Sequence, residues 1–317
     1  MGTVVLSIDA ELGWGFHDLQ QPPRERVENG RRGWPRLLSI LEEYEVPATW
    51  AVVGHLMLDR CDRTHATHPA PDGWFERERT DWRDRSDLRF APDLVRATLE
   101  SPVTHELGCH SFSHVLFGSP ETTGELARAE CRRCQELADG WLPVTDDRAY
   151  PLQSFVYPRN DVGHRDALVD TGFRVYRGRM PTPDGPRGVF DTIVRRRSLL
   201  VHPTIDEYGL VNVPASTFAF RFEGVARTAA ETLWRDPMVV LAKRGIDEAV
   251  TGNGVFHLWL HPNNLVTERD DERMREIIAY VDRRRSETDL RVETMGQVGR
   301  RVRAESDASS LASVPED

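Results

Sequence analysis

The feature that most constrains the fold is an alternation of short apolar runs with longer segments of helical periodicity. Apolar runs of about four to eight residues match buried strands, whereas apolar spacings of three and four residues match helices. Strands that alternate with helices form parallel βαβ units. The runs that we predict as strands are 3–9, 47–54, 103–110, 154–158, 173–177, 209–216, 255–262 and 291–295, and the predicted helices are 33–46, 121–141, 163–171, 225–250 and 270–286.

This order of elements fits either a barrel or an open, doubly wound sheet. No G-x-G-x-x-G and no G-x-x-x-x-G-K-[S/T] follows a predicted strand, which argues against a nucleotide-binding sheet. We expect one catalytic domain over residues 1–303. Within it, residues 55–90 are a charged insertion with scattered aromatic side chains, predicted as an ordered loop. Residues 304–317 are acidic, small and polar, and are predicted to be a disordered tail.

Charge and hydropathy limit the possible partners. The formal net charge is −10 and there is no basic run, so we expect neither nucleic acid nor an anionic membrane as a partner. No apolar stretch approaches the ~20 residues of a membrane-spanning helix. The start of the chain lacks the basic and apolar regions of a secretion signal, so we expect a cytoplasmic protein.

The cysteines give little evidence of a redox or metal site. Cys131 and Cys134 form a C-x-x-C, but they lie in a segment of helical periodicity with no second pair nearby. Two ordinary helix positions are the favoured interpretation. Four cysteines without a framework of pairs also fit a reducing compartment.

Polar side chains collect where the predicted strands end, which is where parallel βα folds carry their chemistry. Asp9 and Glu11 follow the first strand, and His261 ends a late one. The third strand leads into HELGCHSFSH, which holds three of the chain's 11 histidines. The fourth strand ends in Tyr157-Pro158-Arg159-Asn160-Asp161. Two carboxylates, a histidine pair, an arginine and a further histidine are thus expected at one edge.

His110 and His114 are spaced for a shared metal ion. If a helical turn begins after Gly108, an i, i+4 pair lies on one face of it, and imidazole suits zinc and other first-row divalent ions. An isolated H-x-x-x-H is more often structural, with one histidine at a helix cap and the other in the core. A carboxylate from another strand end favours the metal, because a catalytic site needs a third protein ligand.

Asp9 and Glu11 are two residues apart, so in an extended strand both would face the same way. One carboxylate could then bind the ion while the other acts as a base. Taken alone, the pair is better explained as the start of a loop.

These motifs, taken together and in this order, resemble the polysaccharide deacetylase superfamily (the NodB homology domain, or carbohydrate esterase family 4). CHSFSH is similar to the family's H-[S/T]-x-x-H metal motif. DAELGWG, at residues 9–15, is similar to a D-x-E-x-x-W-G opening found in one subgroup. The resemblance covers most of residues 3–300 and implies a distorted (β/α) barrel of seven to eight strands.

The resemblance also implies roles for individual residues. Asp9 matches the family's catalytic base, and Arg159 matches the arginine that holds this base. His110 and His114 match the metal histidines, and His261 matches the late histidine that acts as general acid. The commonest pattern has a second aspartate as metal ligand where this chain has Ala10, so the role passes to Glu11. The implied cofactor is a divalent ion, with zinc as the first candidate.

Further side chains are candidates for substrate binding or for packing. Trp14 and Trp259 could stack on a sugar ring, although wall packing is equally compatible with their positions. Tyr157 and Asn160 are further substrate-binding candidates beside Arg159. His257 alternates with Trp259 and His261 along one strand, and we expect it to be a packed core histidine.

We therefore predict a metal-dependent hydrolase that removes an N-acetyl group from an N-acetylated sugar or surface-glycan precursor and releases acetate. The first alternative is an amidohydrolase of the same fold that opens a small cyclic amide or ureide without a metal. The second is a non-catalytic glycan-binding barrel. Asp9 and His261 are both present, which favours an enzyme.

Overall fold

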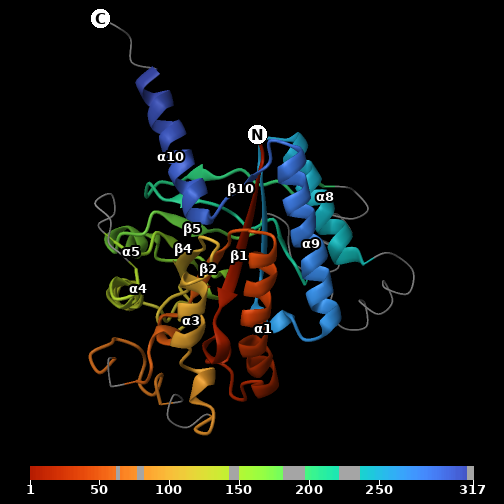
Figure 1. Ribbon diagram of the computed structural model, residues 1–317. Helices are drawn as coiled ribbons and strands as arrows, with labels where there is room; N and C mark the ends of the chain where they lie inside the picture. The colour runs from red at the N-terminus through yellow and green to blue at the C-terminus, as the bar shows by residue number, and fades with distance from the viewer. Residues whose placement is uncertain (62–64, 77–81, 143–149, 181–196, 221–235, 313–317) are drawn as a thin grey trace, which may run out of the picture.

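The computed structural model describes residues 1–61, 65–76, 82–142, 150–180, 197–220 and 236–312. Their strands form one ten-stranded sheet in the order β6-β7-β5-β4-β3-β2-β1-β9-β8, with β10 also paired to β1. All the strand pairs are parallel except β6 with β7. Figure 1 shows the sheet curled, with the helices around it. The predicted α/β class and distorted barrel are confirmed, and the described strands leave the barrel open between β6 and β8.

β1 is the longest of the described strands and places the first two candidate carboxylates. All eight of its residues, Thr3–Ala10, are buried, because it pairs with β9 on one side and with β2 and β10 on the other. A strand covered on both faces requires an apolar run of this kind. The remaining strands are β2 (Thr49–Val52), β3 (Glu106–Cys109), β4 (Ser154–Val156), β5 (Val175–Arg177), β6 (Thr204–Ile205), β7 (Val211–Asn212), β8 (Thr217–Phe218), β9 (Val255–Leu260) and β10 (Arg291–Val292).

The helices cover the sheet, with α9 in contact with both α1 and α8 on one side and α4 against α5 on the other. Three of them have side-chain N-caps typical of helix starts: Thr123 caps α4, Asp236 caps α8 and Thr267 caps α9. The described helices are α1 (Arg24–Glu43), α3 (Pro92–Leu99), α4 (Gly124–Asp139), α5 (Arg165–Asp170), α8 (Pro237–Thr251), α9 (Glu268–Glu287) and α10 (Met295–Ala312).

Several predicted boundaries are corrected. α1 begins at Arg24 rather than at 33, and α3 was not predicted. The strand predicted over 209–216 ends at Asn212, and a second short strand, β8, follows. The first part of the helix predicted over 225–250 lies outside the described residues.

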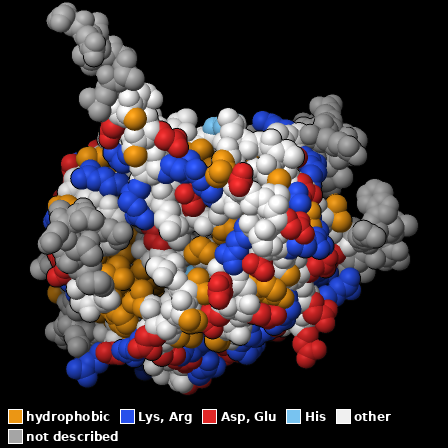
Figure 2. All heavy atoms as spheres, turned by 45° about the horizontal axis from the view of Figure 1, so that its top comes forward, with side chains coloured by type: hydrophobic (Ala, Val, Ile, Leu, Met, Phe, Trp, Pro, Cys, Tyr) orange, Lys and Arg blue, Asp and Glu red, His pale blue; other side chains and the backbone are white. Residues whose placement is uncertain are grey.

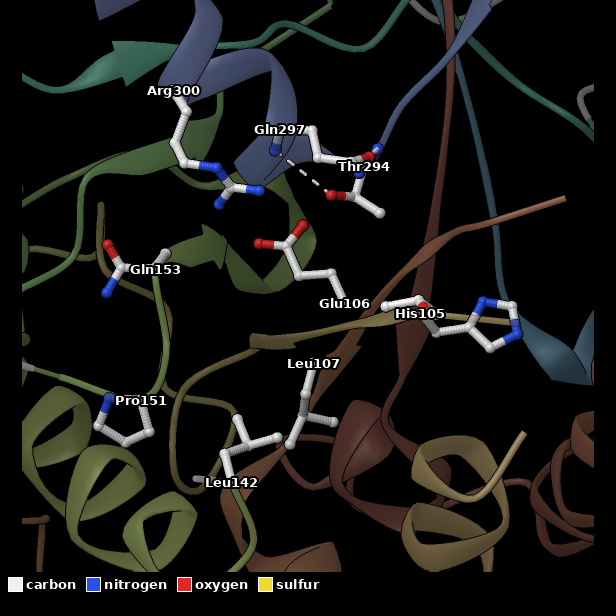
Figure 3. A pocket seen from close by; sticks show the side chains of 10 residues that line it. His105, Glu106, Leu107, Leu142, Pro151, Gln153, Thr294, Gln297 and Arg300 are labelled. Atoms are coloured by element: carbon white, nitrogen blue, oxygen red, sulfur yellow. Dashed lines mark hydrogen bonds between the residues drawn. The ribbon is translucent and has the colours of Figure 1, made fainter. Parts of the chain in front are cut away.

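The tail predicted as disordered from 304 continues as α10 to Ala312. This helix is anchored through its first turn. The Glu106 carboxylate accepts hydrogen bonds from Thr49 Oγ1, Ser154 Oγ and the backbone N–H of Gly296, at 2.8, 2.6 and 2.9 Å. A carboxylate at a helix N-terminus is favoured by the helix dipole. Figure 3 shows Glu106 pointing toward α10 across a small cavity at the amino end of β3.

The other end of the sheet carries the candidate site, and α10 projects away from it in Figure 1. The described parts of the 55–90 insertion lie at this end and pack inward, since Phe75 is tilted against Phe112 of the loop after β3 with ring centroids 6.2 Å apart. On the face shown in Figure 2, basic and acidic side chains are interspersed. None of the described helices is long and apolar enough to cross a membrane.

Candidate active site

The carboxyl ends of β1, β3 and β9 meet at one edge of the sheet, as parallel pairing requires. Their side chains and those of the following loops line a cavity of about 270 Å³. The cavity is open to one side and includes candidate residues from four separated segments. Its lining residues are Asp9, Glu11, Gly15, Phe16, Leu19, Arg26, His114, Arg159, Asn160, Trp259, His261 and Asn263.

Glu11, His110 and His114 form a cluster at the floor of this cavity. Glu11 Oε2 lies 3.1 Å from His114 Nε2 and 3.4 Å from His110 Nε2. One potential ligand atom from each residue lies within 4.8 Å of the other two. All three side chains are buried. The structure thus brings together the three residues that the sequence assigned to the metal.

The hydrogen bond made by Nδ1 of His110 leaves Nε2 to face Glu11. His110 Nδ1 donates to the carbonyl oxygen of Val156 at 2.8 Å, so the neutral ring carries its lone pair on Nε2. This buried Nε2 has no hydrogen-bond partner among the described residues. A backbone carbonyl behind a histidine is the usual outer contact of a metal ligand. Burial also lowers the pKa of His114, although Glu11 opposes the shift, and this favours the neutral ring that a metal needs.

The loop that carries these histidines is not the helical turn that we expected. β3 ends at Cys109, and Ser111 and His114 have positive φ angles of 59° and 63°. The loop is fixed by its neighbours instead. Gly54 N–H donates to Ser111 O, and the buried Glu130 carboxylate accepts from both the N–H and the hydroxyl of Ser113 at 2.7 and 2.6 Å. These bonds offset the cost of a left-handed backbone at non-glycine residues.

Glu11 is held ionised among the histidines. Burial raises the pKa of this carboxyl, but His261, His110 and His114 together lower it well below its usual value. Gly15 is a site residue that the sequence analysis did not select. A Cβ at this position would overlap with the carboxylate of Glu11, so a glycine is required for the side chain to lie where it does.

Asp9 is held by Arg177, which corrects the partner that we expected. Arg177 Nη1 and Nη2 donate to the two carboxylate oxygens of Asp9, each at 2.7 Å, in a two-pronged pair that is almost completely buried. Arg159 pairs instead with Asp18 at 2.7 Å, where 44% of its side chain is exposed. Burial raises the pKa of Asp9, but Arg177 and then His110 outweigh this effect and lower it. Arg177 ends β5, so the strand-end rule could have found it.

A chain of hydrogen bonds fixes Arg177 in turn. Arg177 Nη1 donates to Ser7 Oγ at 3.0 Å, and Ser7 Oγ lies 2.8 Å from His257 Nε2. His257 Nδ1 faces the carbonyls of Val213 and Pro214 and donates to them, so Nε2 accepts a hydrogen bond from the Ser7 hydroxyl. His257 is fully buried, and the prediction of a packed core histidine is confirmed.

His261 lies at the mouth of the cavity, opposite the cluster. Its Nε2 is 3.5 Å from Glu11 Oε1 and 3.9 Å from Asp9 Oδ2, and 18% of the side chain is exposed. β9 ends directly before it, and Pro262 follows, which has no N–H to extend the strand. The backbone N–H of His261 donates to Asn264 Oδ1 at 2.8 Å. His261 can therefore reach both the carboxylates and a molecule in the cavity.

Of the four predicted substrate-binding residues, two line the cavity and two are buried in the core. Trp259 and Asn160 line the cavity, and Asn160 Oδ1 also accepts from Arg177 Nη2 at 2.9 Å. Trp14 and Tyr157 are fully buried, so the structure contradicts their expected contact with a sugar. Trp14 stacks on His55 and donates from its indole N–H to the carbonyl of Arg89.

Other cavity residues were missed by the sequence analysis. Phe16 and Leu19 follow the first strand, Arg26 lies on α1, and Asn263 follows His261. Asn263 sits beside a predicted strand end and could have been found by that rule. Arg26 carries no comparable signal, because it lies on a helix that begins earlier than its apolar pattern indicated.

Comparisons with known proteins agree with this architecture. Residues 20–163 match the model of the polysaccharide deacetylase family. This agrees with the resemblance that the motifs indicated and with the expected class of enzyme, a hydrolase of the polysaccharide deacetylase type that acts on an amide bond. A search of curated proteins found no match.

Three solved structures have a similar fold. A protein from Mycobacterium smegmatis assigned to the polysaccharide deacetylases is 19% identical, with a TM-score of 0.63 over 96% of this chain and 91% of that chain. A Puue allantoinase is 12% identical, with a TM-score of 0.59, and a Pseudomonas aeruginosa PAO1 protein with the polysaccharide deacetylase assignment is 13% identical, with a TM-score of 0.58. Each of these two matches covers 94% of this chain and 89% of the other.

Proposed function

Because residues 20–163 match the polysaccharide deacetylase model, we propose that this protein is a metal-dependent N-deacetylase that releases acetate from an N-acetylated sugar or glycan precursor. The observation that carries the proposal is the position of the Glu11–His110–His114 cluster, which faces Asp9 and His261 in one open cavity. A ligand set, a base and an acid are the parts that amide hydrolysis needs.

Glu11, His110 and His114 would hold the ion. The ligand set of one carboxylate and two imidazoles suits zinc, and an open cavity beside it leaves room for further ligands. His110 Nε2 lies 3.4 Å from Glu11 Oε2 and makes no hydrogen bond among the described residues, which fits a shared cation better than a closed hydrogen-bond network. When bound, a divalent ion would supply Lewis-acid polarisation of the amide carbonyl.

Asp9 would accept the proton of the attacking water. Arg177 holds both of its oxygens, which fixes the carboxylate plane and keeps the group ionised. Ser7 and Asn160 hold the guanidinium in turn, so the base is oriented before substrate enters. Such preorganisation is how a buried carboxylate can act without a large rearrangement.

His261 would donate a proton to the departing nitrogen. An amide nitrogen is a poor leaving group unless it is protonated, so an acid must lie near the scissile bond. His261 Nε2 lies between the two carboxylates and the cavity, and the ring is still partly exposed to an entering molecule. Trp259 lies beside it in the cavity wall, and the small exposed part of its indole would contact a bound sugar.

The substrate would be larger than a single acetamido group. A second cavity of about 400 Å³ shares Arg26 and Asn263 with the first, so the two hollows adjoin. Asn29, Asn263 and Asn264 provide amide groups along the second hollow. Amides and an arginine suit the hydroxyl groups of a carbohydrate.

The test is a comparison of two substrate panels, one of N-acetylated sugars and one of small cyclic amides and ureides. Each panel is measured with metal-free protein and again after zinc is restored. We expect acetate release from the sugars only, and only with zinc. Ring opening of a ureide by the metal-free protein would replace this proposal with the alternative hydrolase, and inactivity of both panels with a tightly bound glycan would favour a binding protein.

A further inference from the structure

A second cluster of metal-ligand side chains lies beside the active site and is not used by the proposed reaction. It consists of His55, Cys61 and His65, of which one potential ligand atom each lies within 4.8 Å of the other two. His55 lies in a short turn, Gly54–Met57, that follows β2, and the other two residues belong to the insertion. We propose that these residues form a second metal site, which binds zinc or a similar borderline-soft divalent ion.

The tautomer of His55 suits a ligand. His55 Nδ1 donates to the carbonyl oxygen of Phe112 at 2.9 Å, so the lone pair of the neutral ring is on Nε2. The same arrangement, with a backbone carbonyl behind the ring, orients His110 in the active site. His55 is completely buried, which holds the ring in one orientation.

Cys61 and His65 complete the set. Cys61 Sγ lies 2.8 Å from His65 Nε2. Two ligands of one tetrahedral zinc, with bonds of about 2.0–2.3 Å, lie about 3.5 Å apart, so binding requires this pair to separate by less than about 1 Å. One thiolate and two imidazoles select zinc over magnesium or calcium, which prefer oxygen.

Aromatic rings surround the two histidines of the cluster. The His65 ring stacks on Phe75 with centroids 3.9 Å apart, and the His55 ring lies 4.0 Å from Trp14 and 3.9 Å from Phe112. A low-polarity shell strengthens the attraction between a cation and a thiolate. A hydrogen-bonded cysteine–histidine pair without an ion is the competing interpretation.

An ion at this position would connect the insertion to the active-site loop. Phe112 lies between His110 and His114, and its carbonyl accepts from both the backbone N–H and the ring of His55. Cys61 and His65 come from the insertion. The ion would therefore have a structural role that is separate from catalysis.

Cobalt(II) binding to the metal-free protein tests the site, because this is the one of the two ligand clusters found among the described residues that contains a cysteine. We expect a thiolate-to-cobalt charge-transfer band in the near ultraviolet and two bound ions per chain. The band should persist in the His110→Ala, His114→Ala double variant, which should bind one ion. It should disappear in Cys61→Ser and in His65→Gln, each of which should also bind one.

His68→Gln is the matched control, because His68 lies three residues further along and is not part of the cluster. It should keep the band and both ions. One ion per wild-type chain with no charge-transfer band would overturn the proposal, as would a band that survives Cys61→Ser. The double variant keeps the charge-transfer band only if the second site exists. It therefore distinguishes loss of the active-site ion from loss of the second ion, even if a cysteine variant fails to fold.

Discussion

Replacement of Arg177 tests whether Arg177, as in the structure, or Arg159, as the family pattern implied, holds the base Asp9. The sequence assigned Asp9 to Arg159, whereas the structure pairs Asp9 with Arg177 through two bonds of 2.7 Å. Arg177→Met removes both bonds and leaves a buried carboxylate without a counter-charge. Arg159→Met is the control, since it removes a half-exposed pair with Asp18.

The expected magnitudes differ widely. Breaking a buried ion pair from one side costs about 3–5 kcal/mol of folding free energy, whereas an exposed pair contributes about 0–1 kcal/mol. A misplaced general base lowers the rate by roughly 10²–10⁴-fold. We therefore expect Arg177→Met to lower kcat by at least about 10²-fold. Arg159 lines the cavity, so its loss should act on KM and leave kcat nearly unchanged.

The assay combines urea unfolding, bound zinc and acetate release for both variants. Bound zinc should be unchanged in Arg177→Met, because no described contact joins Arg177 to Glu11, His110 or His114. Arg177→Lys keeps the charge but replaces the planar, two-pronged guanidinium by a single ammonium group. Its kcat should therefore lie between those of the wild type and Arg177→Met. A wild-type kcat in Arg177→Met together with a large loss in Arg159→Met would refute the assignment.

Three further outcomes follow from the geometry. His261→Ala should lose roughly 10²–10⁴-fold in rate on an N-acetyl sugar but much less on an activated aryl acetate ester, and equal losses on both would make His261 structural. Gly15→Ala should weaken zinc binding about 10-fold or more, since the added methyl overlaps with Glu11, and unchanged affinity in a zinc titration would contradict this. Burial holds the pKa of His257 at about 3, below its ordinary 6.5, so its contribution to stability is present above pH 6.5 and is lost as the pH falls toward 3. Between pH 6.5 and 5 the loss is about 2 kcal/mol. In urea unfolding, His257→Gln should therefore reduce the dependence of the unfolding free energy on pH over this range. An unchanged pH dependence would mean that His257 is already protonated in the folded protein.

The sequence predicted the positions that share a strand end and missed those that depend on how loops fold. Asp9, His110 and His261 could be grouped because parallel strands end at one edge, whatever the loops do. Arg177 obeys the same rule, but the family pattern drew attention to Arg159 instead. Trp14 follows a strand as Glu11 does, and only the path of the loop places the indole in the core.

The helix boundaries failed for a related reason. α1 begins early although Gly33 and Pro35 weaken its pattern, and Gly33 is needed because a Cβ there would overlap with the carbonyl of Pro262. This close approach brings α1 against the segment after His261. α10 has the composition of a disordered tail, but Glu106, about 190 residues earlier in the chain, anchors its first turn. Contacts between distant segments leave no local signal.

The central claim is that Glu11 binds the ion while Asp9 moves the proton, and it is tested by the zinc content and acetate release of Glu11→Ala and Asp9→Asn. Glu11→Ala should bind one zinc fewer than the wild type and release no acetate. Asp9→Asn should bind as much zinc as the wild type and still release almost none. If zinc is lost from Asp9→Asn and retained in Glu11→Ala, the two roles are reversed and the account is wrong.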